Sequence, residues 1–380
     1  MGLTVWSLLA LPGLCIWIII VLLPWRPWST RETLDAGIDT VSGNDLSRIT
    51  VLIPARNEAD VIEQTLQGLA AQGAGPGIIL IDDQSTDQTA AIVHKINLPA
   101  LKIVHGQSLP AGWSGKLWAL EQGRKEINTD LVLLLDADIR LLPGILHTLL
   151  HKLEQDHLDL VSLMAHLNMQ GFWGKLLIPA FIFFFKLLYP FSLSNSPAHR
   201  TAAAAGGCIL VKKSLLDKIG AFHNLKNSLI DDCALARLAK DSGGRTWIGL
   251  THSALSLRPY HSLHTIWDMV ARSAFTQLRY SWALLLLCTG LMTITFLLPL
   301  VAMLFPAPAG WATLSLMFLC YLPTLRYYGI HPLWGCLLPV TGMLYLFMTW
   351  TSAWRHLCRH GASWKDRSYP IDGGKDCNFP

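Results

Sequence analysis

A run of five aliphatic residues followed by two aspartates decides the fold: Leu131-Val132-Leu133-Leu134-Leu135-Asp136-Ala137-Asp138. A short, continuously apolar run is typical of a strand that is buried on both faces of a sheet. Such a strand delivers Asp136 and Asp138 onto the loop at its carboxyl end. Because two loop aspartates are often no more than solvated side chains, the rest of the chain must decide whether they form a site.

Shorter apolar segments before this strand repeat the pattern and alternate with helical spacing. The predicted strands are Ile49–Pro54, Gly77–Ile81 and Leu101–Val104, and the predicted helices are Ala59–Ala71, Asp87–Ile96 and Lys116–Glu126. Strands that alternate with helices predict an α/β fold with a doubly wound, mostly parallel sheet. There is no Gly-x-Gly-x-x-Gly after the first strand and no Walker lysine loop, which argues against a dinucleotide site or a P-loop.

Polar side chains follow three of these strands, at the edge where a doubly wound sheet binds its ligands. They are Arg56-Asn57-Glu58, Asp82-Asp83 and Asp136-Ala137-Asp138. A Mg²⁺ or Mn²⁺ ion bound to a diphosphate takes one or two protein carboxylates together with phosphate oxygens. The two aspartates after the buried strand therefore predict a divalent metal site. The Asp82-Asp83 pair also has a plainer interpretation, a turn followed by a helix cap.

The distribution of charge divides the chain into membrane and soluble parts. Of the 380 residues, 52% are apolar and 15% are charged, which is unusually hydrophobic for a soluble enzyme. No charged side chain lies in residues 1–25, 280–325 or 327–354, and about 20 apolar residues suffice to cross a bilayer. We predict an N-terminal transmembrane anchor over 1–25, a soluble domain over 26–280, a C-terminal transmembrane block of two or three helices over 281–354, and a polar tail over 355–380.

The positions of Lys and Arg predict the orientation. Arg26 and Arg31 follow the first span, and Arg272 and Arg279 precede the second, so both ends of the soluble domain favour the cytosolic side of a bacterial inner membrane. Three C-terminal spans would leave the basic tail on the opposite side. The segment Pro332–Trp354 contains two prolines and two glycines, and it is the candidate for a re-entrant segment.

The cysteines and the net charge exclude other classes of protein. The eight cysteines show neither metal-ligand spacing nor a disulfide framework, in agreement with a reducing cytosol. The net charge of +4 comes without a basic stripe, which argues against nucleic acid as a partner.

Four ordered motifs resemble family 2 glycosyltransferases, which have the GT-A fold and invert the anomeric centre. The motifs are Val51–Glu58, Ile81–Thr89, Gly115–Leu120 and the Asp-x-Asp pair, and the resemblance covers residues 49–280. It implies a nucleotide-sugar donor whose pocket is lined by Pro54, Arg56 and Glu58. It further implies that Asp82 and Asp83 meet the base or ribose and that Lys116 lies near the diphosphate. Asp136 would contact the donor and the metal, and Asp138 would bind the metal.

The same resemblance extends to the acceptor half. Ala205–Val211 resembles the glycine-containing strand under the acceptor, where Gly206 and Gly207 would let a substrate approach the backbone; a bulge or turn is the alternative. Ser228–Leu235 matches the position of the catalytic carboxylates, with Asp231 in place of the more usual Glu. Asp232 aligns with the base that removes the acceptor proton. The alternative interpretation of Asp231 is a helix N-cap.

Two further segments have two interpretations each. Thr276–Tyr280 resembles the Gln/Arg-x-x-Arg-Trp motif of processive and lipid-modifying relatives, although its Gln is one position late. Arg279 would then hold the diphosphate and Tyr280 would stack near the acceptor; a membrane-interface anchor is the alternative. The apolar segment 171–193 is either an interfacial helix that brings the site to the lipid or a buried core helix.

The combined pattern looks like the bacterial hopene-associated glycosyltransferases. Gly112–Lys116, His199-Arg200-Thr201 and Trp364–Tyr369 carry this resemblance. It implies a membrane enzyme that transfers a sugar from a UDP-linked donor to a lipid acceptor in connection with hopanoid metabolism. Transfer to polyprenyl phosphate is a second enzymatic interpretation, and a membrane scaffold with a degenerate transferase domain is a non-catalytic one. A processive synthase is disfavoured because Gln277 is shifted.

Overall fold

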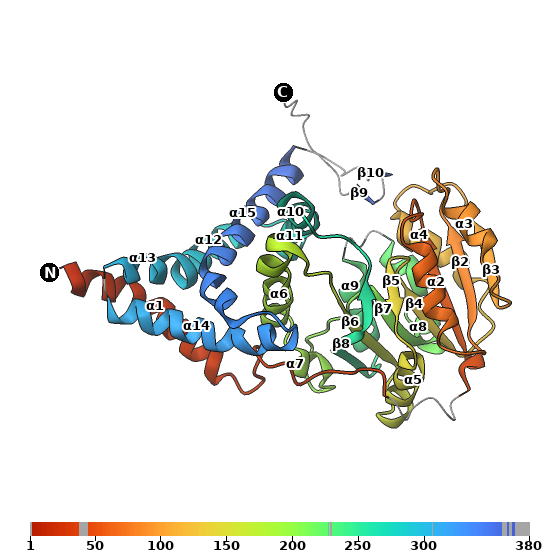
Figure 1. Ribbon diagram of the computed structural model, residues 1–380, viewed down its shortest axis with the longest axis horizontal. Helices are drawn as coiled ribbons and strands as arrows, with labels where there is room; N and C mark the ends of the chain where they lie inside the picture. The colour runs from red at the N-terminus through yellow and green to blue at the C-terminus, as the bar shows by residue number, and fades with distance from the viewer. Residues whose placement is uncertain are drawn as a thin grey trace.

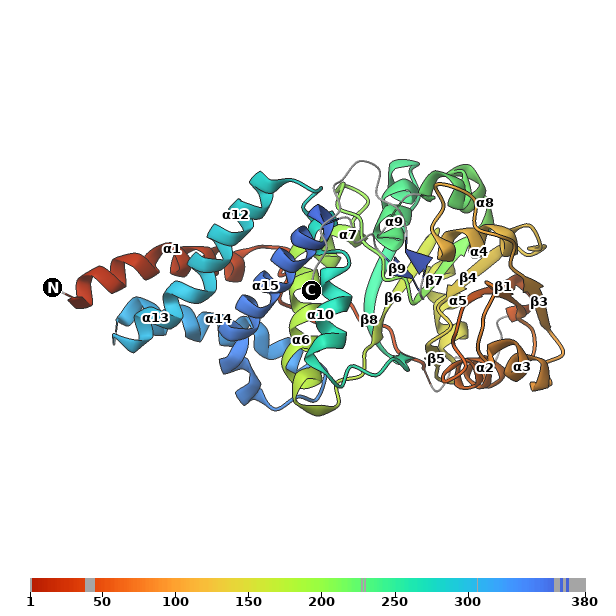
Figure 2. The ribbon, with the colours of Figure 1, turned by 90° about the horizontal axis from the view of Figure 1, so that it is seen from above.

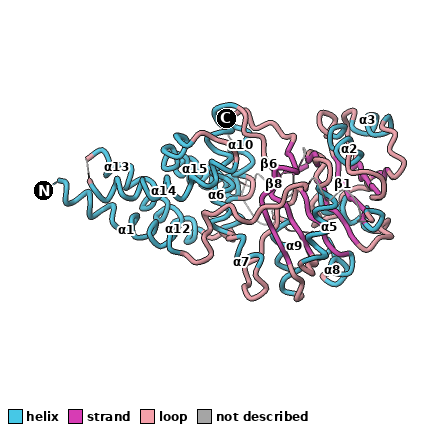
Figure 3. Tube along the Cα trace, turned by 60° about the horizontal axis from the view of Figure 1, so that its bottom comes forward, coloured by secondary structure: helices cyan, strands magenta, loops and turns pink. Residues whose placement is uncertain are grey.

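The computed structural model describes residues 2–37, 45–226, 228, 230–305, 307–358, 363–364 and 367–368. These residues form an α/β part, which contains the large sheet, and a part made of helices (Figures 1 and 3). The N-terminus lies at the end of the helical part that is farthest from the sheet (Figure 1). Most of the predicted tail, 355–380, lies outside the described residues.

Eight strands form the large sheet: β1 (Ile49–Ala55), β2 (Gly77–Asp82), β3 (Leu101–His105), β4 (Leu131–Leu135), β5 (Ile139–Leu141), β6 (Leu160–His166), β7 (Cys208–Lys212) and β8 (Thr246–Ser256). Their order is β3-β2-β1-β4-β7-β6-β8-β5. β7 and β5 run antiparallel to their neighbours, and the other pairs are parallel. The predicted α/β fold with a mostly parallel sheet is confirmed, and all four predicted strands are present.

Helices cover both faces of the sheet. One face carries α2 (Ile62–Ala70), α3 (Thr89–Lys95) and α5 (Ile145–Gln155), and the other carries α4 (Gly115–Arg124), α8 (Lys213–Lys218) and α9 (Asp231–Asp241). Two 3₁₀ turns, Leu46–Arg48 and Ala221–Leu225, complete this part.

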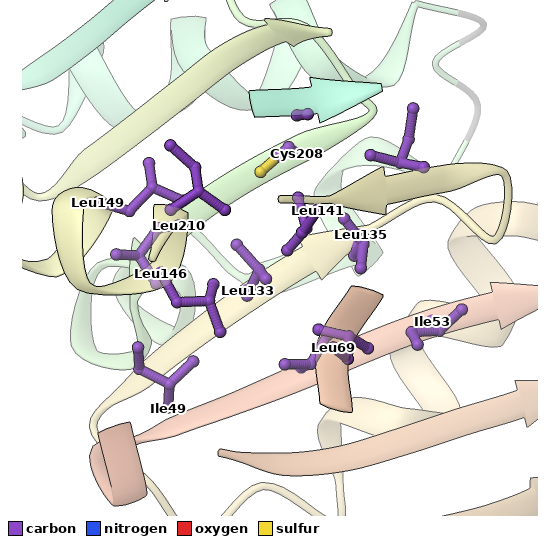
Figure 4. Close-up of a cluster of buried hydrophobic side chains, with 14 of the residues drawn as sticks. Ile49, Ile53, Leu69, Leu133, Leu135, Leu141, Leu146, Leu149, Cys208 and Leu210 are labelled. Carbon is purple, nitrogen blue, oxygen red and sulfur yellow. The ribbon is translucent and has the colours of Figure 1, made fainter. Parts of the chain in front are cut away.

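The aliphatic run of β4 is buried on both sides. Leu133 and Leu135 belong to the core under α2 and α5, which Figure 4 shows, whereas Val132 and Leu134 pack under α4. Complete burial of each such side chain contributes about 1.5–3 kcal/mol. The unbroken apolar run therefore reflects a strand without a solvent face.

The sheet opens between β1 and β4. β1 pairs with β2 as far as Ala55, but it pairs with β4 only as far as Leu52. Pro54, which has no N–H to donate, lies beyond the last residue that pairs with β4. The chain continues from β1 to β2 and β3 on one side and reaches β4 on the other, so this is a topological switch point, where such sheets bind ligands.

The helical part consists of α1 (Gly2–Leu22), α6 (Gly171–Leu188), α7 (Phe191–Asn195), α10 (Leu263–Ala271), α11 (Ala274–Gln277), α12 (Trp282–Met292), α13 (Leu298–Leu304), α14 (Pro308–Tyr327) and α15 (Leu338–Leu357). A π-helical turn, Thr293–Leu297, joins α12 to α13, and a 3₁₀ turn, Pro332–Leu337, precedes α15. Among the described residues, five helices are long and apolar enough to cross a membrane: Val5–Leu22, Gly171–Leu188, Trp282–Leu304, Pro308–Tyr327 and Pro332–Leu357. The N-terminal helix and the C-terminal helical block are therefore present as predicted.

The helices fall into two groups by their contacts. α1, α13 and α14 pack against one another, whereas α15 packs mainly against α10 and α11, nearer the sheet (Figures 1 and 2). α6 lies between the other long helices and the sheet, and half of its residues are buried (Figure 1). The ammonium of Lys186 on α6 is buried and donates to the Ser29 carbonyl. This packing is that of a core helix, and its position at the junction of the two parts also suits an interfacial helix.

The π-helical turn is held against α1. Pro299 has no N–H to donate to the carbonyl of Thr295, four residues before it, and the buried indole N–H of Trp17 donates to that oxygen over 3.2 Å. Gly13 lies against the carbonyl of Ile294, so closely that a Cβ atom would overlap it. The close approach of the two helices therefore requires glycine at this position.

A methyl group at Gly13 is expected to separate α1 from the π-helical turn. We expect Gly13→Ala to destabilise the bundle by about 1–3 kcal/mol, the usual cost of overpacking, measured as a lower Tm in detergent. Gly290→Ala on α12 is the matched control, because a Cβ atom there meets nothing within 4 Å. Equal Tm values for the two variants would contradict this packing.

Candidate active site

A lysine and two aspartates converge where the sheet opens. Lys116 lies in the first turn of α4, Asp136 follows β4, and Asp231 begins α9. The Nζ atom of Lys116 lies 2.8 Å from Oδ1 of Asp136 and 3.6 Å from Oδ2 of Asp231. Burial alone would lower the pKa of Lys116, but the two carboxylates outweigh it and raise that pKa. Lys116 is therefore a fixed cation between β4 and α9.

Asp232 is the partly buried carboxylate beside this cation. Its Oδ2 accepts the Gly206 N–H over 2.9 Å, and its Oδ1 accepts the Cys233 N–H over 2.7 Å. Burial, followed by the negative charge of Asp231, raises the pKa of Asp232 to about 6. A carboxylate with this pKa is largely ionised at neutral pH and yet basic enough to take a proton.

Gly206 and Gly207 fit the site in different ways. A Cβ atom at Gly206 would lie 3.2 Å from the Nζ of Lys116 and 3.4 Å from Oδ2 of Asp232, so a side chain would intrude between these two groups. Gly207 packs on Ile139, and its carbonyl accepts the Asp136 N–H over 3.1 Å. Both glycines precede β7, and Gly206 alone lines the cavity described next.

A small cavity at the switch point is lined by several of the predicted site residues. Its polar and glycine lining comprises Lys116, Asp136, Gly206, Asp231 and Asp232, and its other lining residues include Pro54, Leu134 and Phe222. The predicted alternative for Asp231, a helix N-cap, is not what the structure shows, since Ile230 occupies the N-cap position and Asp231 is the first helical residue. Leu229 of the same motif lies outside the described residues.

Asp138 faces a different cation. Its Oδ2 lies 2.7 Å from the Nε of Arg258, and its side chain is only 9% exposed. Arg258 stands two residues after β8, where the Leu257 N–H donates to the Asp138 carbonyl over 2.8 Å. Burial would lower the pKa of Arg258, but Asp138 outweighs it and raises that pKa. The backbone contact thus holds the guanidinium on the second carboxylate of the motif.

The predicted donor residues Arg56, Glu58 and Asp83 lie on the loops that follow β1 and β2, and these two loops are joined by hydrogen bonds. Arg56 donates from Nη1 to the carbonyls of Asp83 (2.6 Å) and Gln84 (2.9 Å). Asp82 accepts the Ser85 N–H on its side chain over 3.1 Å. The side chains of Asp82, Asp83 and Glu58 are buried. The loops are therefore preorganised at the edge that also carries Asp136.

The pair Arg279-Tyr280 lies between α11 and α12. Tyr280 stacks on His356 of α15 with 4.4 Å between the ring centroids, and its hydroxyl bonds Thr276. Arg279 is exposed. Gln277 accepts a 2.6 Å bond from the hydroxyl of Tyr189, which follows α6. Tyr280 is thus held against α11 and α15 of the helical part.

Three residues near the site were missed in the sequence: Arg258, Arg272 and Tyr189. Arg272 lies near Arg258 and the carboxylates of Asp231 and Asp136, and burial and the charge of Arg258 lower its pKa. Arg258 carried a usable signal, since it is the first Lys, Arg, Asp or Glu after residues 246–257, which contain none. Tyr189 carried none, because its place depends on how α6 packs.

The donor set fits a divalent metal that arrives with a diphosphate. Asp136 and Asp138 supply hard carboxylate oxygens, which suit Mg²⁺ or Mn²⁺. Among the described residues, no group of three or more His, Cys, Asp or Glu side chains could hold a metal ion. Both carboxylates are also neutralised by Lys116 and Arg258. Two carboxylates are the complement expected when phosphate oxygens provide the remaining ligands.

A segment of the α/β part matches a known protein family. Residues 50–220 match the model of glycosyl transferase family 2. The chain is similar to 4,4'-diaponeurosporenoate glycosyltransferase of Staphylococcus haemolyticus, with 30% identity over 99 residues, which are 26% of each chain. It is also similar to poly-beta-1,6-N-acetyl-D-glucosamine synthase of Staphylococcus aureus, with 35% identity over 114 residues, which are 29% of this chain and 25% of that one. The matches span about a quarter of the length of these curated relatives.

A solved structure agrees with the fold over most of the chain. The mannosyltransferase PcManGT from Pyrobaculum calidifontis, in complex with GDP-Man and Mn²⁺, has a TM-score of 0.55 and 18% identity. The alignment covers 93% of this chain and 99% of that one. At this identity the likeness concerns the fold alone. Residues 50–220 thus match the model of glycosyl transferase family 2, and the chain has a GT-A-like, mostly parallel sheet.

Proposed function

We propose that the chain is a membrane-bound inverting glycosyltransferase that moves a sugar from a nucleotide-diphosphate sugar to a lipid hydroxyl. The observation that carries the proposal is the arrangement around Asp232. A partly buried carboxylate with a raised pKa lies beside the Lys116–Asp136 ion pair, in a cavity at the switch point of the sheet. Such a pairing of a base with an anion-binding cation suits transfer from a diphosphate leaving group.

In the proposed reaction, Asp232 takes the proton of the acceptor hydroxyl as its oxygen attacks the anomeric carbon. A new carbon–oxygen bond forms on one face of the sugar while the bond to the diphosphate breaks on the other. The nucleoside diphosphate leaves with the electron pair of that bond. A divalent metal held by Asp136 and Asp138 would offset the charge that develops on the leaving group. Gly206 keeps Asp232 in place through its N–H.

The proposed donor site lies at the ends of β1 and β2. Pro54, Arg56 and Glu58 line the nucleotide pocket, and Asp82 and Asp83 meet the base or ribose. The buried, cross-linked loops support this role, because a preorganised pocket loses little entropy on binding. A UDP-linked donor is proposed from the family resemblance. Arg279 is proposed as a further donor contact and Gly207 and Tyr280 as acceptor contacts.

The proposed lipid acceptor is supported by the continuity between the site and the helical part. Cys233, next to Asp232, belongs to one cluster of buried side chains with α6, α14 and α15. The hydroxyl of Tyr189, which follows α6, donates to Gln277 of α11. Burial raises the pKa of Tyr189, and so does the charge of Asp232, which lies nearby. An acceptor that reaches Asp232 thus has apolar helices on one side.

We propose that the chain crosses the inner membrane three times, through α1, α12–α13 and α14, with the catalytic domain in the cytosol. α14 ends at the catalytic domain, where the ring of His252 bonds the Tyr327 carbonyl over 3.0 Å. α15 ends at α10, which belongs to the predicted soluble domain 26–280, and Arg355 lies 2.6 Å from Asp268 of that helix. Since the segment from Tyr327 to Arg355 thus begins and ends against residues of the same predicted domain, α15 is proposed to stay on that side. The proposal places Pro332–Trp354 as the predicted re-entrant segment and the basic tail in the cytosol.

This topology predicts that a reporter at the C-terminus is cytosolic. A fused alkaline phosphatase should be inactive and a fused green fluorescent protein should be fluorescent. The matched control is a fusion after Phe305, between α13 and α14, which should give the reverse result. An active phosphatase at the C-terminus would contradict the three-span arrangement.

The proposed link to hopanoid metabolism rests on the resemblance to hopene-associated glycosyltransferases. Deleting the gene should remove one glycolipid from the membrane lipid profile measured by mass spectrometry. Wild-type enzyme should restore this lipid, and membranes that contain it should transfer label from the matching nucleotide sugar in competition with unlabelled donors. Loss of a polyprenyl-phosphate sugar instead would favour the second enzymatic interpretation, and an unchanged profile with no turnover would favour the scaffold.

A further inference from the structure

Arg258 forms an ion pair with Asp138, and Asp138 is the carboxylate that binds a metal in the proposed function. The two side chains are joined by the 2.7 Å contact, and the Leu257 N–H bond to the Asp138 carbonyl fixes their backbones side by side. Arg258 is always charged, so this pairing persists over the whole physiological pH range. In the absence of donor, Asp138 is therefore already neutralised by a cation of the protein.

A metal ion cannot simply join this pair. A divalent cation at Asp138 would stand close to the guanidinium, and the like charges would repel each other in a partly buried site. The other carboxylate of the motif, Asp136, is held by Lys116 over 2.8 Å. Among the described residues, no group of three or more His, Cys, Asp or Glu side chains is present that could hold the ion against this repulsion. The affinity of the empty site for a metal alone is thus expected to be low.

A diphosphate reverses this balance. Guanidinium groups pair with phosphate oxygens in a bidentate manner, so a diphosphate offers Arg258 a better partner than one carboxylate. Arg272 lies near enough to Arg258 for its pKa to be lowered by that charge, and an anion between the two would relieve their repulsion. Once Arg258 turns to the diphosphate, the oxygens of Asp138 are free for the metal.

We infer that Arg258 is an internal competitor for the metal site, which couples divalent metal binding at Asp138 to the presence of a nucleoside diphosphate. The inference rests on the metal use in the proposed function. Its consequence is a resting enzyme without bound metal, in which metal and nucleotide bind cooperatively and each raises the affinity of the other by the same factor.

The test measures Mn²⁺ binding to the full-length chain in detergent by equilibrium dialysis, with and without UDP or GDP at equal free concentration on both sides. For the wild type we expect nucleotide to tighten Mn²⁺ binding about tenfold or more, within the usual range of coupling between sites. Arg258→Gln should bind Mn²⁺ about tenfold more tightly than the wild type without nucleotide and should lose most of the coupling. Arg48→Gln, which breaks an exposed pair with Glu154 away from the site, is the matched control.

The outcomes separate the inference from the proposed function. Equal Mn²⁺ affinity of the wild type with and without either nucleotide would overturn the inference, as would an unchanged metal-only affinity in a folded Arg258→Gln variant. No Mn²⁺ binding to the wild type under any condition would instead overturn the metal use on which it rests. The Tm of each variant in detergent, compared with Arg48→Gln, shows that the protein being dialysed is folded.

Discussion

The Asp232→Asn variant is expected to lose transfer to a hydroxyl acceptor by about 10³-fold, within the range by which a positioned general base accelerates proton transfer. The amide has nearly the shape of the carboxylate, and its one oxygen can still accept the Gly206 N–H bond, which is 2.9 Å long in the wild type, so only the local bond from the Cys233 N–H loses its acceptor. The fold and the donor affinity should therefore stay close to wild type. The measurement is turnover in membranes with a labelled nucleotide sugar, with nucleotide affinity measured in parallel.

Asp231→Asn is the matched variant, because it removes the neighbouring carboxylate that faces Lys116 instead of Gly206. It should keep much more activity than Asp232→Asn. The reverse ranking would make Asp231 the base. If Asp232→Asn keeps most of its rate, the acceptor is an already ionised group such as a phosphate, which needs no base.

The pH dependence of transfer should carry the signature of the same residue. Asp232 accepts a proton only when ionised, and its pKa is raised to about 6, so the rate should fall as the pH drops through about 6 and level off above it. Burial and Asp231 raise this pKa, and the loss of the Asp231 charge should lower it. The acid limb of Asp231→Asn should therefore move to lower pH; a limb that stays in place would separate Asp232 from the observed ionisation.

Asp138→Ala is expected to reduce transfer by roughly 10²- to 10³-fold, because the metal that neutralises the leaving diphosphate loses a ligand and several kcal/mol of transition-state stabilisation go with it. The defect should not be rescued by excess Mg²⁺ or Mn²⁺. The measurement is the rate against metal concentration at saturating donor.

Asp130→Ala is the control for this variant, since Asp130 stands at the opposite end of the same strand and is exposed. It should leave the metal dependence unchanged. Full activity of Asp138→Ala would contradict the metal role of the Asp-x-Asp pair, and equal losses in the two variants would indicate damage to β4 rather than to the site.

Local sequence was most informative where burial acts on consecutive residues. Val132 and Leu134 face one core while Leu133 and Leu135 face the other, so the whole strand had to be apolar and was visible in the sequence. Polar residues at the ends of β1, β2 and β4 could be expected to meet because parallel strands share one edge.

Contacts between distant segments were beyond such reasoning. The partner of Asp138 is Arg258, 120 positions later, after the strand β8 that no predicted pattern identified. The motif around Tyr280 likewise gave no sign that its ring stacks on His356 of α15. Side-chain partners of this kind depend on how separate elements pack, and packing is not encoded in the spacing of one segment.

The sequence by itself determined the alternation of strands and helices, the apolar segments and the positions of the carboxylates, because each follows from periodicity and burial within a short stretch. Only the tertiary structure decided which cation each carboxylate faces, that Asp232 rather than Asp231 accepts the Gly206 N–H, and that α14 ends against His252 while α15 ends against Asp268 of α10. These facts arise where elements far apart in the chain are packed together, and there the distance in space, not the distance in sequence, sets the electrostatics.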